Sequence, residues 1–244
     1  MTKLSIAIIG YGKMGKEVEK YASELGHEVV CIIDNENDWN SKIDLLKKAN
    51  VAIEFTTPQN APDNIKKCFE IDLPVVTGTT GWYSAFPEIE KLCVNNKQTL
   101  FYASNFSLGV NILFEINKRL AALMNSFDDY NVLIEETHHT QKLDAPSGTA
   151  ITLAEGISNV INRYSDWKLL ENSPTENDIP VKANRINNIF GIHEVIYSSD
   201  IDSIEIKHSA KSRKGFAKGA IMAAEWVFKK KGVFSMKDML NIKD

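Results

Sequence analysis

The sequence predicts an α/β protein, with a parallel sheet in its first half and a smaller α+β domain with a mixed sheet in its second. Over the first hundred residues, short apolar runs rich in β-branched residues alternate with stretches of helical spacing. Such alternation is typical of right-handed βαβ units and a parallel sheet. After about Phe106 this alternation stops, which indicates a second domain of different architecture.

Each expected strand of the first half is a short apolar run, which favours burial on both faces of a parallel sheet. These runs are residues 4–9, 28–33, 51–55, 74–77 and 99–102. A helix is expected after the first strand, ending near Gly26, where glycine favours a helix stop. Further helices are expected at 59–71 and 87–94.

The second half begins with a long helical segment at 110–124. The elements expected after it are a strand at 130–135, a helix at 149–162, a polar proline-containing loop at 171–184, strands at 192–197 and 203–208, and a helix at 218–230. These elements predict a parallel-sheet domain followed by an α+β domain.

Composition excludes several classes of protein. A net charge of −4 argues against a nucleic-acid binder, which normally has a basic surplus. No apolar run approaches the roughly 20 residues that a membrane-spanning helix needs. The three cysteines, Cys31, Cys68 and Cys93, are widely scattered and suggest no disulfide framework. We therefore expect a cytoplasmic enzyme with no nucleic-acid or membrane partner.

A glycine-rich turn follows the first strand and opens a helix. Its sequence is Gly10-Tyr11-Gly12-Lys13-Met14-Gly15. The first glycine suits the tight turn, the second the approach of a pyrophosphate, and the third close helix–strand packing. Asp34 lies 19 residues after Gly15, at the end of the second strand, where a carboxylate accepts hydrogen bonds from a ribose diol. The pattern predicts a Rossmann-like dinucleotide domain; the alternative is a turn that uses its glycines for shape alone.

The residue after Asp34 favours NADH over NADPH as the cofactor. Asn35 stands where an arginine would offset the repulsion between the carboxylate and a 2′-phosphate. Lys13 or Lys16 could still reach a phosphate, so both nucleotides stay open.

Two further polar segments end expected strands. Gly78-Thr79-Thr80-Gly81 follows the fourth strand, and Ala103-Ser104-Asn105-Phe106 follows the fifth. Ligands of open α/β sheets bind outside the carboxyl ends of their strands, so both segments are candidates for contact with a nicotinamide. The alternative for each is ordinary turn chemistry.

The segment from Glu135 to Ala150 concentrates chemistry. It contains adjacent histidines, His138 and His139, and a lysine, Lys142, within five residues. Adjacent strand residues point to opposite sides, so we expect one histidine to transfer protons and the other to bind substrate. Lys142 supplies a positive charge and can also supply a proton.

A helix start follows directly. Ser147 has the character of an N-cap, and the amides of Gly148 and Thr149 would then form a carboxylate site. Asp144 and Glu136 either orient the cations or are solvated loop carboxylates. A metal site built on the two histidines lacks a third ligand at metal spacing, so no metal is expected.

These motifs resemble one known family. Glu136-x-His138-His139-x-x-Lys142-x-Asp144-Ala145-Pro146-Ser147-Gly148-Thr149-Ala150 is similar to the signature of the dihydrodipicolinate reductases. Residues 78–81, 104–111 and the closing segment 234–240 resemble further motifs of that family in the same order, so the resemblance spans essentially the whole chain.

The resemblance implies reduction of a cyclic dicarboxylate with NADH or NADPH, with loss of water, on the route to diaminopimelate and lysine. It implies that His138 is the general acid/base, that Lys142 is a proton donor, and that His139, Gly148 and Thr149 hold the substrate carboxylates. Cofactor contacts would come from Gly10 to Gly15, Asp34, Gly78 to Thr80, and Ala103 to Phe106. It implies that the C-terminal helix packs back on the cofactor domain, so that 1–106 and 214–244 form one discontinuous domain and 107–213 the substrate and oligomerisation domain. It also implies closure of the two domains over the ligands and a homotetramer formed through the second domain's sheet. Whether the hydroxylated or the dehydrated ring binds first stays open.

The chain departs from the family pattern in two places. Many members have one more residue in the glycine turn, and many carry an arginine where this chain has Asn35. Two other functions remain as alternatives: a different two-domain nicotinamide oxidoreductase acting on a sugar or an amino acid, and a dinucleotide-sensing regulator without turnover.

Overall fold

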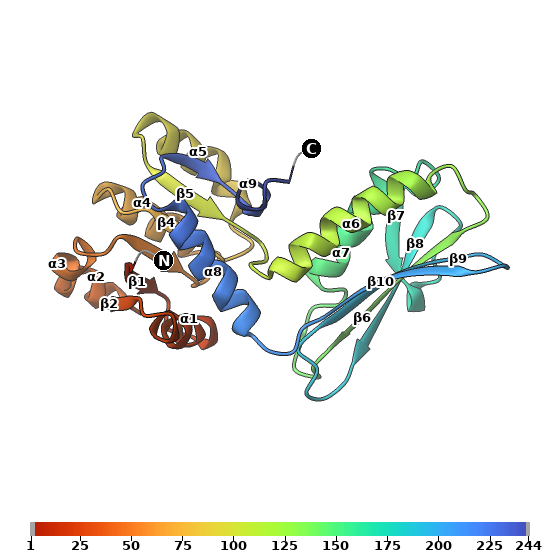
Figure 1. Cartoon of the computed structure of the whole chain (residues 1–244), viewed down its shortest axis with the longest axis horizontal. Coiled ribbons are helices and arrows are strands. Elements are labelled where there is room, and N and C mark those ends of the chain that lie inside the picture. The colour runs from red at the N-terminus through yellow and green to blue at the C-terminus, as the bar shows by residue number, and fades with distance from the viewer. Residues whose placement is uncertain (1–2, 243–244) are drawn as a thin grey trace. The chain divides into compact units, whose positions relative to one another are not determined.

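The computed structural model describes residues 3–242. The chain divides into two compact units, one formed by Met1–Ser107 with Arg213–Asp244 and the other by Leu108–Ser212 (Figure 1). None of the helices within residues 3–242 is long and apolar enough to cross a membrane. All three cysteines are free and buried.

The first unit is built on a six-stranded sheet whose paired neighbours all run parallel, in the order β11-β5-β4-β3-β1-β2. The strands are β1 (Ser5–Ile9), β2 (Glu28–Ile33), β3 (Val51–Glu54), β4 (Val75–Thr77), β5 (Thr99–Tyr102) and β11 (Gly232–Phe234). The four central strands, β5, β4, β3 and β1, are buried along almost their whole length, as the continuous apolar runs predict.

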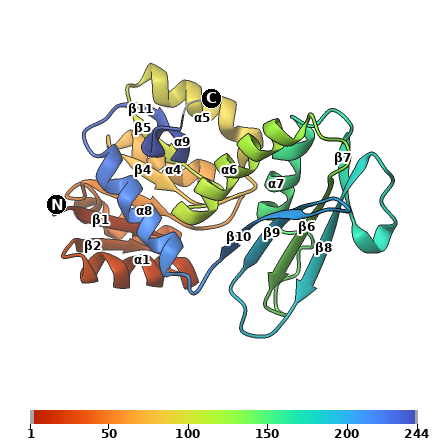
Figure 2. The same ribbon diagram turned by 45° about the vertical axis from the view of Figure 1, so that its right-hand side comes forward.

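Helices cover both faces of this sheet. They are α1 (Lys13–Glu24), α2 (Glu36–Ser41), α3 (Ile43–Leu46), α4 (Ala61–Glu70), α5 (Phe86–Asn95), α8 (Lys214–Val227) and α9 (Met236–Leu240), with the short 3-10 helix η1 (Tyr83–Ala85). α1 and α8 pack side by side and α8 runs across β3, β4 and β5, as Figure 2 shows. Chain order reverses between β1 and β3, so the carboxyl ends of these two strands form the switch point at which open α/β sheets bind ligands.

The second unit packs α6 (Leu108–Met124) and α7 (Gly148–Ser158) together beside a five-stranded mixed sheet of order β10-β9-β6-β8-β7. Its strands are β6 (Asn131–His138), β7 (Asp166–Leu169), β8 (Asp178–Arg185), β9 (Ile192–Ser198) and β10 (Ser203–Ser209), and the 3-10 helix η2 (Leu170–Asn172) follows β7. β6 runs antiparallel to β9 and parallel to β8. Apolar residues of β6, β8, β9 and both helices form one core.

The α/β class with a second, mixed sheet is confirmed, but one expected loop is wrong. Residues 178–184 belong to β8, which pairs with both β6 and β7. Pro180 and the polar residues around it hid this strand, because proline in a run normally argues against a central strand. The sequence also did not predict five short elements, because each is too short to show a hydrophobic periodicity. These are α2, α3, β7, β11 and α9.

Candidate active site

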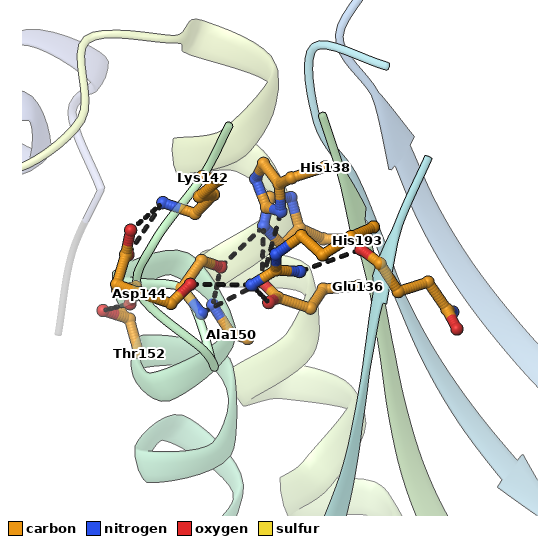
Figure 3. A network of polar contacts seen from close by, with 11 residues as sticks. Glu136, His138, Lys142, Asp144, Ala150, Thr152 and His193 are labelled. Carbon is orange, nitrogen blue, oxygen red and sulfur yellow. Dashed lines mark hydrogen bonds and ion pairs between the residues drawn. The ribbon is translucent and has the colours of Figure 1, made fainter. Parts of the chain in front are cut away.

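A fully buried carboxylate, Glu136, lies at the centre of the polar cluster in Figure 3. Its Oε1 accepts a hydrogen bond from Arg185 Nη2 at 3.1 Å, and its Oε2 accepts one from the Ser147 amide at 3.1 Å. His138 Nδ1 lies 3.4 Å from the same Oε2. The alternation along β6 explains this placement, because Glu136 and His138 occupy the buried face that Val132 and Ile134 fill lower on the strand.

A second imidazole, missed in the sequence, completes the cluster. His193 on β9 lies directly opposite Glu136 in the antiparallel register. Its ring packs edge-on against His138, with ring centroids 4.9 Å apart, and its Nε2 lies 3.1 Å from Ser147 Oγ. The sequence signal that could have indicated His193 is the alternation of side chains along residues 192–198, which places His193 on the buried face of its strand.

Burial makes both imidazoles poor proton acceptors. Burial lowers the pKa of His138; the nearby Glu136 opposes this, and the cations Lys142 and Arg185 add to it. Burial, with the His138 ring beside it, lowers the pKa of His193 to about 3, although Glu136 Oε2 is only 3.8 Å away. Both rings are therefore neutral at neutral pH, and the cluster's positive charge comes from Arg185 and Lys142.

Lys142 and Asp144 form an ion pair beside this cluster, with Lys142 Nζ at 2.7 Å and 2.8 Å from the two carboxylate oxygens. Burial acts to raise the pKa of Asp144, but the hydrogen bonds from Lys142 prevail and hold that pKa below its usual value. Arg185 Nη2 donates to the Asp144 carbonyl at 2.6 Å, which ties this loop to β8. Asp144 thus orients a cation, the first of the two roles considered from the sequence.

The remaining histidine and the helix start lie next to these groups in the chain. His139 follows the end of β6, and its carbonyl accepts the Lys142 amide at 3.1 Å. Ser147 is the N-cap of α7, with its Oγ accepting from the Ala150 amide at 3.3 Å. Gly148 begins the helix, and a Cβ added there would meet no atom within 4 Å. The first turn of α7 therefore offers open space to an anion.

Glu136, His138 and His193 also have the composition of a metal site, since one ligand atom from each lies within 4.8 Å of the others. The sequence reading considered His139 for such a site, whereas the structure groups His193 with Glu136. Arg185 already pairs with Glu136, and a divalent cation would add charge beside that guanidinium.

In the first unit, the surroundings of the three glycines in the Gly10–Gly15 turn differ. Gly10 has a φ of +89°, and a Cβ there would lie 2.1 Å from the Phe55 carbonyl oxygen. At Gly15 a Cβ would lie 2.1 Å from the Gly10 carbonyl oxygen, whereas at Gly12 it would meet no atom within 4 Å. Two glycines therefore serve packing and the middle one faces open space, an arrangement that fits a pyrophosphate.

Asp34 contacts this turn directly, because its Oδ1 accepts the Tyr11 amide at 2.8 Å. The Tyr11 hydroxyl donates to Glu19, and Lys16 Nζ lies 5.5 Å from the centre of the Tyr11 ring. Asn35 caps α2, where its Oδ1 accepts the Asp38 amide at 3.1 Å.

Two of the pockets in this unit contain expected cofactor residues. The first, of about 240 Å³, is lined by Met14, Phe55, Gly78, Ser104, Asn105, Phe106, Arg213 and Phe216. It brings together five of the expected cofactor residues and adds Phe55, Arg213 and Phe216, which the sequence reading missed. Gly78 is required here, since a Cβ would lie 2.0 Å from the Phe55 ring. The second pocket, of about 320 Å³, contains Asp34.

A second buried glutamate, Glu54, organises the loops beside the first pocket. Its carboxylate accepts the Thr56 amide at 3.0 Å and the Thr79 hydroxyl at 2.9 Å, and the hydroxyls of Thr56 and Thr77 donate to it as well. Of the remaining expected cofactor residues, Thr80 is exposed and Ala103 is buried at the end of β5. The sequence did not indicate the role of Glu54, because a single glutamate in an apolar run carries no recognisable motif.

Comparison with known proteins points to one family. The family models described as the N-terminus and the C-terminus of dihydrodipicolinate reductase match residues 4–106 and 109–240. The chain is 45% identical over 238 residues to a 4-hydroxy-tetrahydrodipicolinate reductase of Christiangramia forsetii, covering 98% of each chain. It is 35% identical over 243 residues to the enzyme of that name from Bdellovibrio bacteriovorus, covering 98% of this chain and 97% of the relative.

A solved structure shares the fold. The dipicolinate-bound dihydrodipicolinate reductase of Paenisporosarcina sp. TG-14 superposes with a TM-score of 0.73 at 22% identity, covering 99% of this chain and all of that one. The family models and the curated relatives both span nearly the whole sequence. The chain therefore belongs to the dihydrodipicolinate reductase family, whose members are oxidoreductases.

Proposed function

We propose that this protein reduces 4-hydroxy-tetrahydrodipicolinate to tetrahydrodipicolinate, with loss of water, in the pathway to diaminopimelate and lysine. The observation that carries the proposal is the cluster around Glu136, in which two cations and two imidazoles lie beside the start of α7. Such a cluster suits a small dianion that must also exchange a proton.

The substrate's carboxylates are assigned to the helix start and the neighbouring cations. The amides of Gly148 and Thr149, at the positive end of α7, bind one carboxylate, and His139 is a further ligand of the substrate carboxylates. Lys142 contributes charge, which stabilises electron density that reaches the ring during reduction, and it can also donate a proton. These roles follow the family motif, residue by residue.

His138 handles the proton. Its lowered pKa keeps the His138 imidazole neutral in the free protein, and a bound dicarboxylate would raise that pKa again by placing negative charge nearby. Proton uptake by His138 thus follows substrate binding, and the imidazolium can then protonate the reduced ring. The reduced nicotinamide, when bound, supplies the hydride to the conjugated carbon.

The nucleotide is assigned to the first unit, with its pyrophosphate at Gly10 to Gly15 and its ribose at Asp34. Tyr11, Lys13 and Met14 lie within that turn, while Gly78 to Thr80 and Ala103 to Phe106 follow β4 and β5. NADH is favoured over NADPH because Asp34 repels a 2′-phosphate and Asn35 is engaged as a helix cap. A homotetramer, a cytoplasmic location and closure of the domains belong to the same proposal.

The test is a reductase assay with substrate generated by the preceding aldolase, run in parallel with NADH and NADPH. The wild-type protein should consume reduced nicotinamide, with NADH preferred. His138→Gln should lower kcat by about 10²- to 10⁴-fold and leave the Kd of the nucleotide unchanged. His27→Gln is the control, because His27 lies in the first unit and lines neither of the two pockets described there. Equal losses of turnover and nucleotide binding in His138→Gln would remove His138 from the chemistry, and absence of turnover in the wild type would overturn the function.

A further inference from the structure

The 320 Å³ pocket beside Asp34 is predominantly acidic. It lies between the segment after β2 and the start of α4, and its charged lining residues are Asp34, Glu36, Asp63 and Lys67. Three carboxylates thus face one ammonium. This pocket adjoins the residue that the proposed function assigns to the ribose, so its charge bears directly on whether a 2′-phosphate can be accommodated.

Lys67, the cation that lines this pocket, is held by Glu36. Its Nζ lies 2.7 Å from each of the two Glu36 carboxylate oxygens and 5.1 Å from the centre of the Trp39 ring. Glu36 is the first residue of α2, where the Asn35 cap fixes the backbone. Both ends of the contact are therefore set by secondary structure, since Lys67 lies on α4.

We propose that Glu36 strengthens the preference for NADH over NADPH by occupying the ammonium of Lys67. The inference rests on the proposed use of a dinucleotide and adds a specificity residue to it. A 2′-phosphate is a dianion that needs a cation partner. In the wild-type pocket that partner is already neutralised, so a 2′-phosphate meets uncompensated carboxylates instead.

Removal of the Glu36 charge should therefore release Lys67 toward the ligand. Asp34 and Asp63 remain in the pocket, so the preference for NADH over NADPH should become smaller but should not reverse. The Glu36 side chain is 73% exposed, so loss of its charge should leave the fold intact, because exposed ion pairs contribute little to stability.

The test measures binding rather than turnover. Dissociation constants for NADH and NADPH are determined by calorimetry at about 0.15 M salt, where charges beyond about 8 Å are largely screened. The quantity of interest is the ratio of the NADPH Kd to the NADH Kd. Glu36→Gln should lower this ratio about tenfold, mainly through tighter NADPH binding.

Glu88→Gln is the matched control. Glu88 pairs at 2.8 Å with Lys66, the neighbour of Lys67 on α4, so this variant removes the same charge from a similar ion pair outside the pocket lining. Its ratio should equal that of the wild type. The double variant Glu36→Gln/Lys67→Gln should not show the tighter NADPH binding of Glu36→Gln, because it lacks the Lys67 ammonium.

The outcomes separate the two proposals. A wild-type protein that binds neither nucleotide contradicts the proposed function itself. NADH binding with an unchanged ratio in Glu36→Gln, or a gain that Glu88→Gln also shows, overturns the role of Glu36 alone. A gain that persists in the double variant excludes Lys67 as the cation responsible.

Discussion

Each unit buries one glutamate completely, and the two are stabilised in different ways. Glu54, at the end of β3, is surrounded by three threonine hydroxyls and a backbone amide. Glu136, on β6, meets a guanidinium, a backbone amide and an imidazole. Hydroxyls fix the shape of loops without adding charge, whereas cations brought in by a carboxylate change the electrostatics of a whole site.

This contrast separates a positioning role from an electrostatic one. Glu54 connects the ends of β3 and β4, so it sets the loops where the proposed cofactor contacts lie. Glu136 holds Arg185 beside His138 and so helps to place positive charge where the proposed dicarboxylate binds. The same residue type therefore serves backbone geometry in one unit and the pairing of charges in the other.

The largest expected effect is that of Glu136→Gln on stability. The substitution leaves the partly buried Arg185 without its counter-charge, and breaking such a pair typically costs about 3–5 kcal/mol. Urea unfolding followed by circular dichroism measures the change in the free energy of unfolding. A loss below about 1 kcal/mol would contradict the claim that Glu136 compensates the charge of Arg185.

Glu54→Gln is the counterpart and should cost less, about 1–2 kcal/mol. Hydroxyl donors can rotate to accept from the new amide, so only part of the hydrogen bonding is lost. The same urea experiment applies, with nucleotide affinity as a second measurement, because the threonine loops should loosen. A larger loss than in Glu136→Gln would reverse the comparison between the two glutamates.

A third effect, spread over several pH units, comes from His193. The folded chain holds the pKa of His193 at about 3, below its usual value near 6.5, so on acidification the unfolded chain binds a proton before the folded chain does. The free energy of unfolding should therefore fall as pH drops from about 6.5 toward 3, by up to about 1.4 kcal/mol per pH unit from this group. Urea midpoints between pH 5 and 7 should depend less on pH in His193→Gln, and an unchanged slope would exclude this imidazole as the cause.

The smallest expected effect is that of Asp144→Asn. Its pair with Lys142 is partly exposed, and such pairs contribute less than about 1 kcal/mol. The unfolding free energy should hardly change, while steady-state kinetics should show an altered KM, because Lys142 loses its orientation. A KM equal to that of the wild type would make Asp144 a solvated loop residue, the alternative considered from the sequence.

The sequence predicts most of the first unit because continuous apolar runs and the Gly10–Gly15 turn are local signals. It also locates the segment around His138, whose motif is compact. It could not locate His193 or Arg185, which reach Glu136 through strand pairing across more than 45 residues. Lys67 likewise lies far along the chain from Asp34, so the sequence indicated only Lys13 and Lys16 as cations that could reach a phosphate and gave no sign of Lys67.

The pKa of His138 tests the central claim most directly. Proton NMR titration, with the resonance assigned by its absence in His138→Gln, gives this pKa with and without pyridine-2,6-dicarboxylate. We expect a value below 6.5 in the free protein and a clear rise in the complex, because the dianion favours the imidazolium. A pKa that is the same in both states, or one above 6.5 in the free protein, would contradict a site in which dicarboxylate binding charges His138.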